Sequence, residues 1–189
     1  MKFSVHELAD GQTILSGVVA GRRLFAQFVA QAIHSSANGV AFLDFAGIQV
    51  ATGSFLRESV MAFRDYARST LPDLYPVVAN PTASVSEELE FVLKHRKDAM
   101  WTCSLDSDGQ PTGASLIGEL DSAHRLTFDM VAALGSATAP NLAQQGDAAL
   151  GPTAWNNRLA FLTSRGLLRE RRVGKTKTFT PVLESFDGN

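Results

Sequence analysis

Cysteine and long apolar stretches are scarce in this sequence, and each shortage excludes a class of protein. Cys103 is the single cysteine among 189 residues, so the chain cannot close an internal disulfide or build a metal site on several thiolates. Polar residues interrupt every apolar stretch after Lys2, so we expect neither a signal-peptide core nor a membrane span. We therefore expect a cytoplasmic protein without membrane contact.

Signatures of catalysis and of metal binding are missing as well. The four histidines, His6, His34, His95 and His124, have no paired spacing, and no serine lies in a G-x-S-x-G pattern. The acids Glu87, Glu88 and Glu90 fit a solvated helix face better than a catalytic pair. We expect no enzymatic activity, no metal and no cofactor.

Charge is distributed unevenly along a chain of ordinary globular composition, with 45% hydrophobic and 19% charged residues. Residues 151–180 hold seven of the 17 Lys and Arg but one of the 19 Asp and Glu, a net charge of +6. The rest of the chain therefore carries −8. A basic segment on an acidic chain indicates contact with a polyanion, although a solvated charged face is the alternative.

Residues 1–120 alternate between strand and helix patterns, which is typical of an α/β domain. The predicted strands are Lys2–Leu8, Thr13–Val19, Val40–Phe45, Tyr75–Ala79, Met100–Leu105 and Gly113–Ile117. Apolar spacing predicts helices over Arg22–Ile33 and Phe55–Ser69, and a third that contains Val85 and Leu89. Ser54 and Ser84 are the expected N-caps of the second and third helices.

Residues 121–185 follow a different pattern, which predicts three helices and a hairpin. In the first helix, the residues expected to face inward are Leu126, Met130, Val131 and Leu134. Thr138 is the expected cap of a short second helix, which Gly146 ends.

The third predicted helix begins near Pro152 and ends at Gly166. Its expected inward residues are Trp155, Leu159 and Leu162, which places Thr153, Asn156, Asn157 and Ala160 outward. The hairpin that follows is predicted from Leu167–Val173 and Thr176–Val182, turning at Gly174-Lys175.

These three helices and the basic hairpin resemble the winged helix-turn-helix of bacterial transcription regulators. The resemblance rests on residues 138–143 at the start of the second helix, on Asn157-Arg158-Leu159 in the third, and on Gly166-Leu167-Leu168-Arg169 at the exit into the wing. It implies that the third helix reads the major groove of double-stranded DNA and that the hairpin lies over the phosphates. The DNA-binding residues implied are Thr153, Asn156, Asn157, Arg158, Arg169, Arg171, Arg172, Lys175 and Lys177.

The first domain resembles the STAS-like family, which is related to anti-sigma-factor antagonists. The segment Val40–Ile48, followed by Ser54-Phe55 and an amphipathic helix, resembles that family's central strand, loop and helix. Members of the wider family act as partner-binding switches, and some are phosphorylated on a serine in an Asp-Ser-x-Gly loop. The loop here, Ala51-Thr52-Gly53-Ser54, has no acid before the hydroxyl. Thr52 and Ser54 are therefore candidate phosphosites, and the simpler alternative is that Ser54 only caps a helix.

We therefore predict an α/β STAS-like domain over residues 1–120 and a winged helix-turn-helix over residues 121–185. The expected function is transcription regulation by DNA binding, with a protein partner or self-association at the STAS-like domain controlling DNA occupancy. A homodimer is expected by analogy with regulators that bind two half-sites. The alternative function is a protein-interaction adaptor whose winged helix docks a protein instead of DNA.

Overall fold

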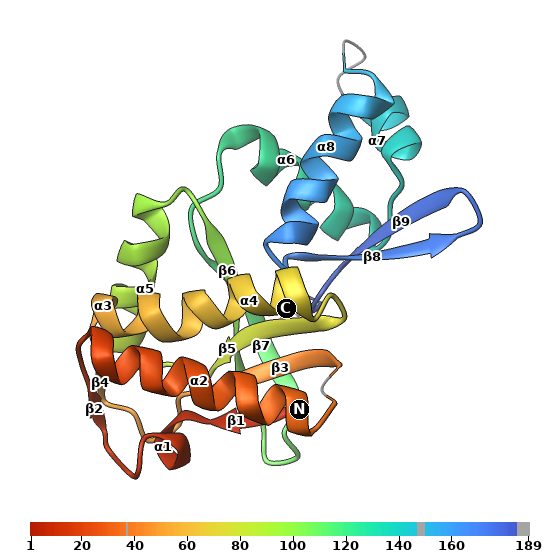
Figure 1. The fold of residues 1–189 in the computed structure, drawn as a ribbon. Coiled ribbons are helices and arrows are strands. Elements are labelled where there is room, and N and C mark those ends of the chain that lie inside the picture. Colours follow the sequence, from red (N-terminus) through yellow and green to blue (C-terminus); the bar gives the residue numbers. More distant parts are fainter. Residues whose placement is uncertain (37, 147–149, 185–189) are drawn as a thin grey trace. The chain divides into compact units, whose positions relative to one another are not determined.

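The chain forms two compact units, Met1–Glu119 and Leu120–Ser185, in the computed structural model shown in Figure 1. The structure describes residues 1–36, 38–146 and 150–184. Within the described residues, no helix has the length and apolar character needed to cross a membrane.

The first unit is built on a five-stranded sheet that is mostly parallel. Its strands are β1 (Lys2–Ser4), β3 (Gly39–Asp44), β5 (Leu74–Ala79), β6 (Ala99–Leu105) and β7 (Pro111–Gly118). They lie in the order β1-β3-β5-β6-β7, and all neighbours are parallel except β6 and β7. Two short strands, β2 (Ile14–Leu15) and β4 (Val50–Ala51), form a separate parallel pair. The predicted α/β class is confirmed.

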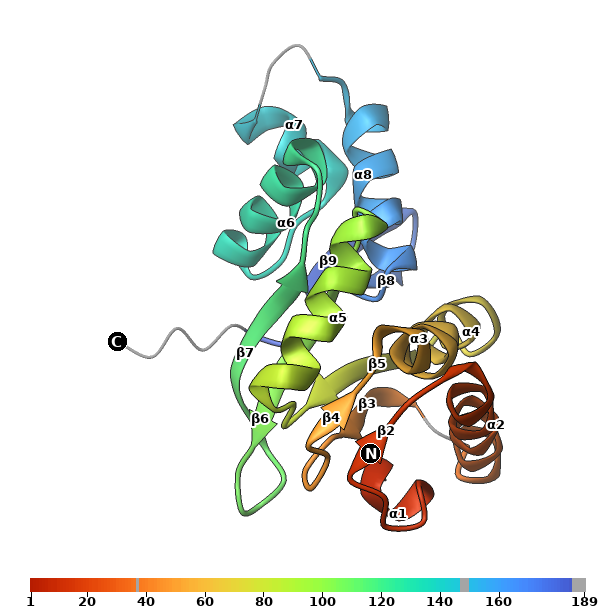
Figure 2. The same cartoon turned by 90° about the vertical axis from the view of Figure 1, so that its left-hand side faces the viewer.

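Helices follow the strands of this sheet. They are α1 (Val5–Leu8), α2 (Val18–His34), α3 (Gly53–Leu56), the π-helical segment η1 (Arg57–Met61), α4 (Ala62–Thr70) and α5 (Ala83–His95). Because the parallel strands are ordered as in the sequence, each crossover steps in the same direction, and right-handed crossovers place their helices on one face of the sheet. Figure 2 shows α5 running alongside β6 and β7.

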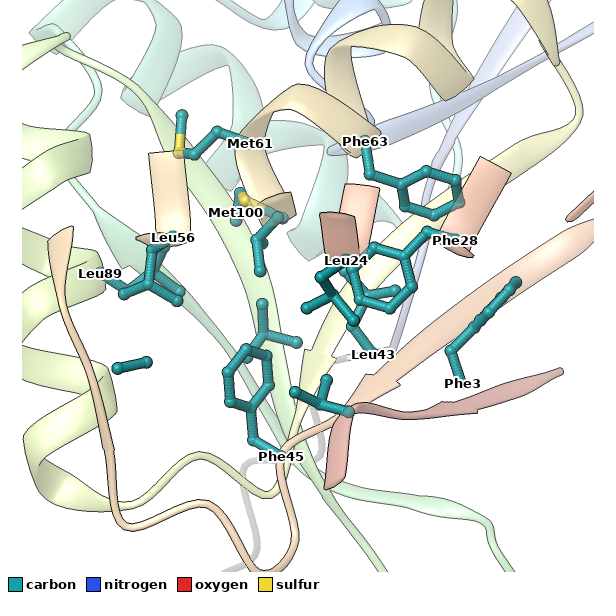
Figure 3. Packing of buried hydrophobic residues seen from close by; sticks show 14 of the residues in the cluster. Phe3, Leu24, Phe28, Leu43, Phe45, Leu56, Met61, Phe63, Leu89 and Met100 are labelled. Atoms are coloured by element: carbon teal, nitrogen blue, oxygen red, sulfur yellow. The ribbon is translucent and has the colours of Figure 1, made fainter. Parts of the chain in front are cut away.

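A buried hydrophobic cluster joins these helices to the sheet (Figure 3). Its aromatic centre is formed by Phe3 of β1, Phe28 of α2 and Phe63 of α4. The centroid of the Phe3 ring lies 5.8 Å from the centroids of the other two rings, which are 5.1 Å apart. Such ring pairs contribute about 0.5–1.5 kcal/mol each beyond the area they bury. The cluster takes alternate residues of the strands, Ala41 and Leu43 in β3, so the residues between them face the other side of the sheet.

The predicted caps Ser54 and Ser84 are wrong, and the threonine two residues earlier is the cap in both places. Thr52 accepts a hydrogen bond from the backbone N–H of Phe55, and Thr82 accepts one from Val85. Both threonines have the extended backbone of an N-cap, whereas both serines already lie inside the helices. Both helix starts read Thr-x-Ser, and the apolar periodicity of the helix does not indicate which of the two hydroxyl residues is the N-cap.

Two predicted strands at the N-terminus are also shorter than expected. Lys2–Leu8 is extended only to Ser4, because the Ser4 side chain accepts from the Glu7 N–H and starts α1. Thr13–Val19 contributes only the two residues of β2, because Gly17, with φ +85°, turns the chain into α2. Over such short segments a β-branched composition does not exclude a helix start.

The second unit contains α6 (Ser122–Leu134), α7 (Ala139–Gln145), α8 (Pro152–Ser164), β8 (Leu168–Val173) and β9 (Thr176–Pro181). This order of three helices and a hairpin agrees with the prediction. Thr138 caps α7 in a reciprocal capping box with Asn141, and Gly166 ends α8 with φ +73°. Trp155, Leu159 and Leu162 are fully buried, so the predicted inward face of α8 is confirmed.

The predicted inward face of α6 is only partly right. Val131 is fully buried, but Leu126 and Leu134 are 50% and 42% exposed. Thr127 and Phe128 take the inward positions instead, and the Thr127 hydroxyl donates to the Ala123 carbonyl at 2.8 Å. That bond satisfies the hydroxyl inside the helix, so a polar residue is accommodated in the core at low cost.

Candidate nucleic-acid interface

Five of the seven Lys and Arg in residues 151–180 lie on the β8–β9 hairpin, which extends beyond the helices of this unit in Figure 1. Its register pairs Arg171 with Thr178 and Arg172 with Lys177, and the turn at Gly174-Lys175 closes it. Gly174 has φ +63°, a left-handed conformation that glycine adopts without strain. The hairpin predicted from the sequence is confirmed.

Three cations at the turn end of the hairpin are exposed to solvent: Arg171, Arg172 and Lys175. The Arg172 Nε donates to the Gly174 carbonyl at 3.2 Å, which orients this side chain near the turn. Because long exposed cations need no rearrangement to meet a phosphate, this end of the hairpin is suited to contact a polyanion.

Two other predicted phosphate contacts already have partners inside the unit. The Lys177 ammonium lies 2.8 Å from the Glu170 carboxylate, so part of its charge is neutralised. The half-buried Arg169 donates to the Val182 carbonyl at 3.3 Å and so links β8 to the chain that follows β9. This contact gives Arg169 a structural role that the sequence did not predict.

The outward face of α8 contains the predicted base-reading residues. Thr153, Asn157 and Ala160 are exposed, and Asn156 is half-buried. The half-buried Arg158 lies over the Trp155 ring, with its guanidinium carbon 5.1 Å from the centroid, a cation–π contact. Thr153 and Asn157 are therefore the polar residues of this face of α8 that are exposed to a ligand.

The first turn of α8 contains no acidic residue, and its N-cap residue makes no side-chain hydrogen bond. Gly151 occupies the N-cap position, and Pro152 is the first helical residue. Helix N-termini of this kind are favourable for phosphate because their N–H groups and the helix dipole attract anions.

The predicted phosphosites lie at the start of α3, next to a carboxylate that is predicted to lie on a solvated helix face. The Thr52 hydroxyl accepts from the N–H groups of Gly17 and Phe55, at 3.3 Å and 3.4 Å, and lies 3.2 Å from the Ser54 hydroxyl. Glu88 of α5 accepts from the Gly53 N–H at 2.9 Å. A phosphate at Thr52 or Ser54 would have to compete with this carboxylate for the same helix start.

Outside this interface, the ionisable groups that the structure describes do not assemble into a metal centre. Among the residues that the structure describes, no group of three His, Cys, Asp or Glu is placed to hold a metal ion. Cys103 is buried, and loss of solvation, together with the charge of Asp44, raises the pKa of its thiol to about 11.

No protein family model, curated protein or solved structure matches this chain. The resemblance to the STAS-like family and to winged-helix regulators therefore stays a prediction, and so do the functions that it implies.

Proposed function

We propose that the second unit is a winged helix that binds double-stranded DNA, and that the protein is a transcription regulator. The observation that carries this proposal is the cluster of exposed cations, Arg171, Arg172 and Lys175, at the turn end of the β8–β9 hairpin. Glu170 is the one acid in residues 151–180, and it pairs with Lys177 rather than with any of these three cations.

The order of elements in the second unit supports the winged-helix assignment. Between α6 and α7, Ala137 forms an antiparallel bridge to Phe179 of β9, with both backbone bonds present at 2.9 Å and 2.8 Å. The unit thus has the sequence helix, bridge, helix, helix, hairpin, in which a third helix with an exposed polar face precedes a basic wing. In groove-reading proteins such a helix contacts base edges while the wing contacts phosphates.

In this proposal the first unit is a STAS-like domain that binds a protein partner or a second copy of the chain, and thereby controls how much DNA is bound. Its mostly parallel sheet, with helices between the parallel strands, supports an assignment to this class of switch domain, as does the loop at Thr52 and Ser54 before an amphipathic helix. Phosphorylation at this loop would add charge beside Glu88 and disturb the start of α3.

The proposal is tested by measuring DNA affinity of the full chain over a range of salt concentrations. Lys175→Ala should weaken binding to all sequences alike and should lower the salt slope by about one. Asn157→Ala should instead relax the preference for particular base pairs, at a cost of about 1–3 kcal/mol at the preferred site. Arg23→Ala, which removes an exposed cation from α2 of the first unit, is the matched control and should leave affinity unchanged. Equal effects of all three variants would refute the assigned interface.

A protein-docking adaptor is the second candidate, and one observation favours it. Leu126 and Leu134 lie on one side of α6 and are 50% and 42% exposed, while the half-buried Met130 lies between them. An apolar row of this kind is suited to protein contact rather than to DNA. The adaptor predicts no DNA binding at low salt, and loss of partner binding when Leu126 is replaced by serine.

A further inference from the structure

A cavity of about 440 Å³ lies in the first unit, on the sheet face that points away from the core cluster. Phe42 and Asp44 of β3 alternate with the core residues Ala41 and Leu43, so their side chains point to the cavity side. The other walls come from β1, from the segment after β5 and from the turn between β6 and β7. A volume of this size is typical of sites for small ligands or for a single side chain.

Asp44 is the buried polar group of this cavity, with a residue exposure of 6%. Its Oδ1 accepts from the Asn80 side chain at 2.8 Å and from the Ala46 N–H at 3.0 Å. Asn80, which has φ +50°, in turn accepts from the Leu105 N–H at 2.9 Å. These bonds join segments 36 and 25 residues apart and hold the carboxylate in one orientation.

The second oxygen of Asp44 has a weaker partner. Lys2 Nζ lies 3.5 Å from Oδ2, and the Lys2 side chain is 59% exposed. Charge-assisted hydrogen bonds are normally about 2.7–2.9 Å long, and an exposed lysine loses conformational freedom when it is held in place. The Met1 ammonium is directed elsewhere, to the Val40 carbonyl at 3.0 Å. Lys2 is thus a counter-ion that another cation can replace.

The charge of the cavity walls selects the sign of the ligand. Two cations line the cavity, the Lys2 side chain and the Met1 ammonium, against the carboxylates of Asp44 and Asp106, so the walls become negative overall when Lys2 is displaced. Phe42, Leu105 and Pro111 supply apolar surface beside these groups. This combination disfavours anions and suits a cation that carries a short apolar stem.

We propose that this cavity binds a primary amine or a guanidinium, whose cationic group replaces Lys2 at Asp44 Oδ2. The stem of the ligand then lies against Phe42 and Leu105. The same chemistry is supplied by a free aliphatic amine or by a Lys or Arg side chain of a protein partner. This proposal does not depend on DNA binding by the second unit.

The test is calorimetric titration of the full chain with putrescine, agmatine and the tripeptide Gly-Arg-Gly with acetylated N-terminus and amidated C-terminus, with succinate as the anionic control. Binding of putrescine or agmatine would identify a small-amine site, whereas binding of the tripeptide alone would identify a side-chain site. We expect Lys2→Met to raise the affinity several-fold, because it removes the competing ammonium. The proposal is overturned if no amine or peptide binds at about 10 mM, a concentration that detects even millimolar dissociation constants.

Asp44→Asn removes the charge while keeping an Oδ1 that can accept from Asn80 and Ala46. We expect it to lower amine affinity about ten-fold or more, since hydrogen bonds to charged groups are the stronger ones. Asp73→Asn, a change of an exposed acid outside the cavity, should have no effect. An unchanged affinity in Asp44→Asn would contradict the proposal. If that variant does not fold, Lys2→Met decides, because an unchanged or lower affinity there also contradicts it.

Discussion

At the scale of single residues, Arg64 and Asp98 carry charges that are almost completely removed from water in the first unit, each with a side-chain exposure of 1%. Arg64 donates to the Asp98 carboxylate at 2.7 Å and to the Ala99 carbonyl at 3.3 Å, and it also bonds the partly exposed Asp65. The pair fixes α4 to the start of β6. Buried pairs of this kind gain little net free energy, but removal of one partner leaves a buried charge uncompensated.

Arg64→Leu should therefore lower the free energy of unfolding by about 3–5 kcal/mol, because Asp98 would remain buried without this partner. Chemical denaturation of the full chain measures the change. Arg23→Ala serves as the control for loss of an exposed arginine and should change stability by less than about 0.5 kcal/mol. Equal stability of Arg64→Leu and the parent chain would show that the pair does not hold α4 in place.

Cys103 provides a prediction that depends on pH. Burial and the nearby Asp44 charge raise the pKa of its thiol to about 11, so the folded protein holds the neutral form near pH 8. We expect alkylation of the folded chain to be about two orders of magnitude slower than in denaturant, where the thiol pKa is about 8.5. Because the folded pKa is the higher one, the stability from this group is complete below the unfolded pKa and is lost as pH rises toward 11. Equal alkylation rates in the two states would contradict the buried placement.

At the scale of elements, α2 packs closely against the helical segment formed by α3 and η1. Gly21 permits this approach, because a Cβ built there would lie 2.7 Å from the Phe55 carbonyl oxygen and 3.0 Å from the Glu58 Cβ. An exposed ion pair between Arg22 and Glu58, at 3.0 Å, lies beside this contact and lowers the pKa of the Glu58 carboxyl. Backbone proximity, rather than the ion pair, sets the spacing of these helices.

Gly21→Ala should destabilise the chain by about 1–3 kcal/mol, although alanine is the better helix former, because the backbone at Phe55 cannot move away without repacking. Thermal or chemical unfolding measures this change. Ala30→Gly, at an exposed position of the same helix, separates the two effects, since it should cost only about 1 kcal/mol through helix propensity. Stabilisation by Gly21→Ala would contradict the close approach of these helices.

The elements that local patterns define could be predicted from the sequence. The inward face of α8, the capping threonine of α7 and the turn of the basic hairpin each depend on residues within one or two turns of chain, and all three are confirmed. The rotation of α6 could not be predicted, because Thr127 is accepted in the core only through its bond to Ala123.

Contacts between distant segments of the chain could not be predicted from the sequence either. The bonds from Gly53 to Glu88, from Arg64 to Asp98 and from Asn80 to Asp44 join residues 35, 34 and 36 positions apart. A single sequence carries no local pattern for such pairs. The position of Asp44 at the end of an apolar strand was the one available signal, since the carboxyl ends of parallel strands are where ligands commonly bind.

At the scale of the whole molecule, the two units differ in net charge, +3 for residues 120–185 and −4 for residues 1–119, and the basic excess is concentrated in residues 151–180. Residues 151–180 carry +6 while the rest of the chain carries −8, so the overall charge of −2 conceals a strongly basic segment. Such a division is expected if one unit contacts a polyanion and the other responds to a different ligand or partner. The hairpin turn and α8 belong to the basic segment, whereas the cavity at Asp44 lies in the first unit.

The central claim is that the second unit binds DNA in a sequence-specific manner. The most direct measurement is selection of a random duplex library by the full chain at two salt concentrations, followed by sequencing of the retained DNA. Our account predicts enrichment of a defined site, with affinity that falls steeply as salt rises because phosphate contacts release counterions. Absence of retained DNA at low salt would contradict the claim and favour the protein-docking adaptor.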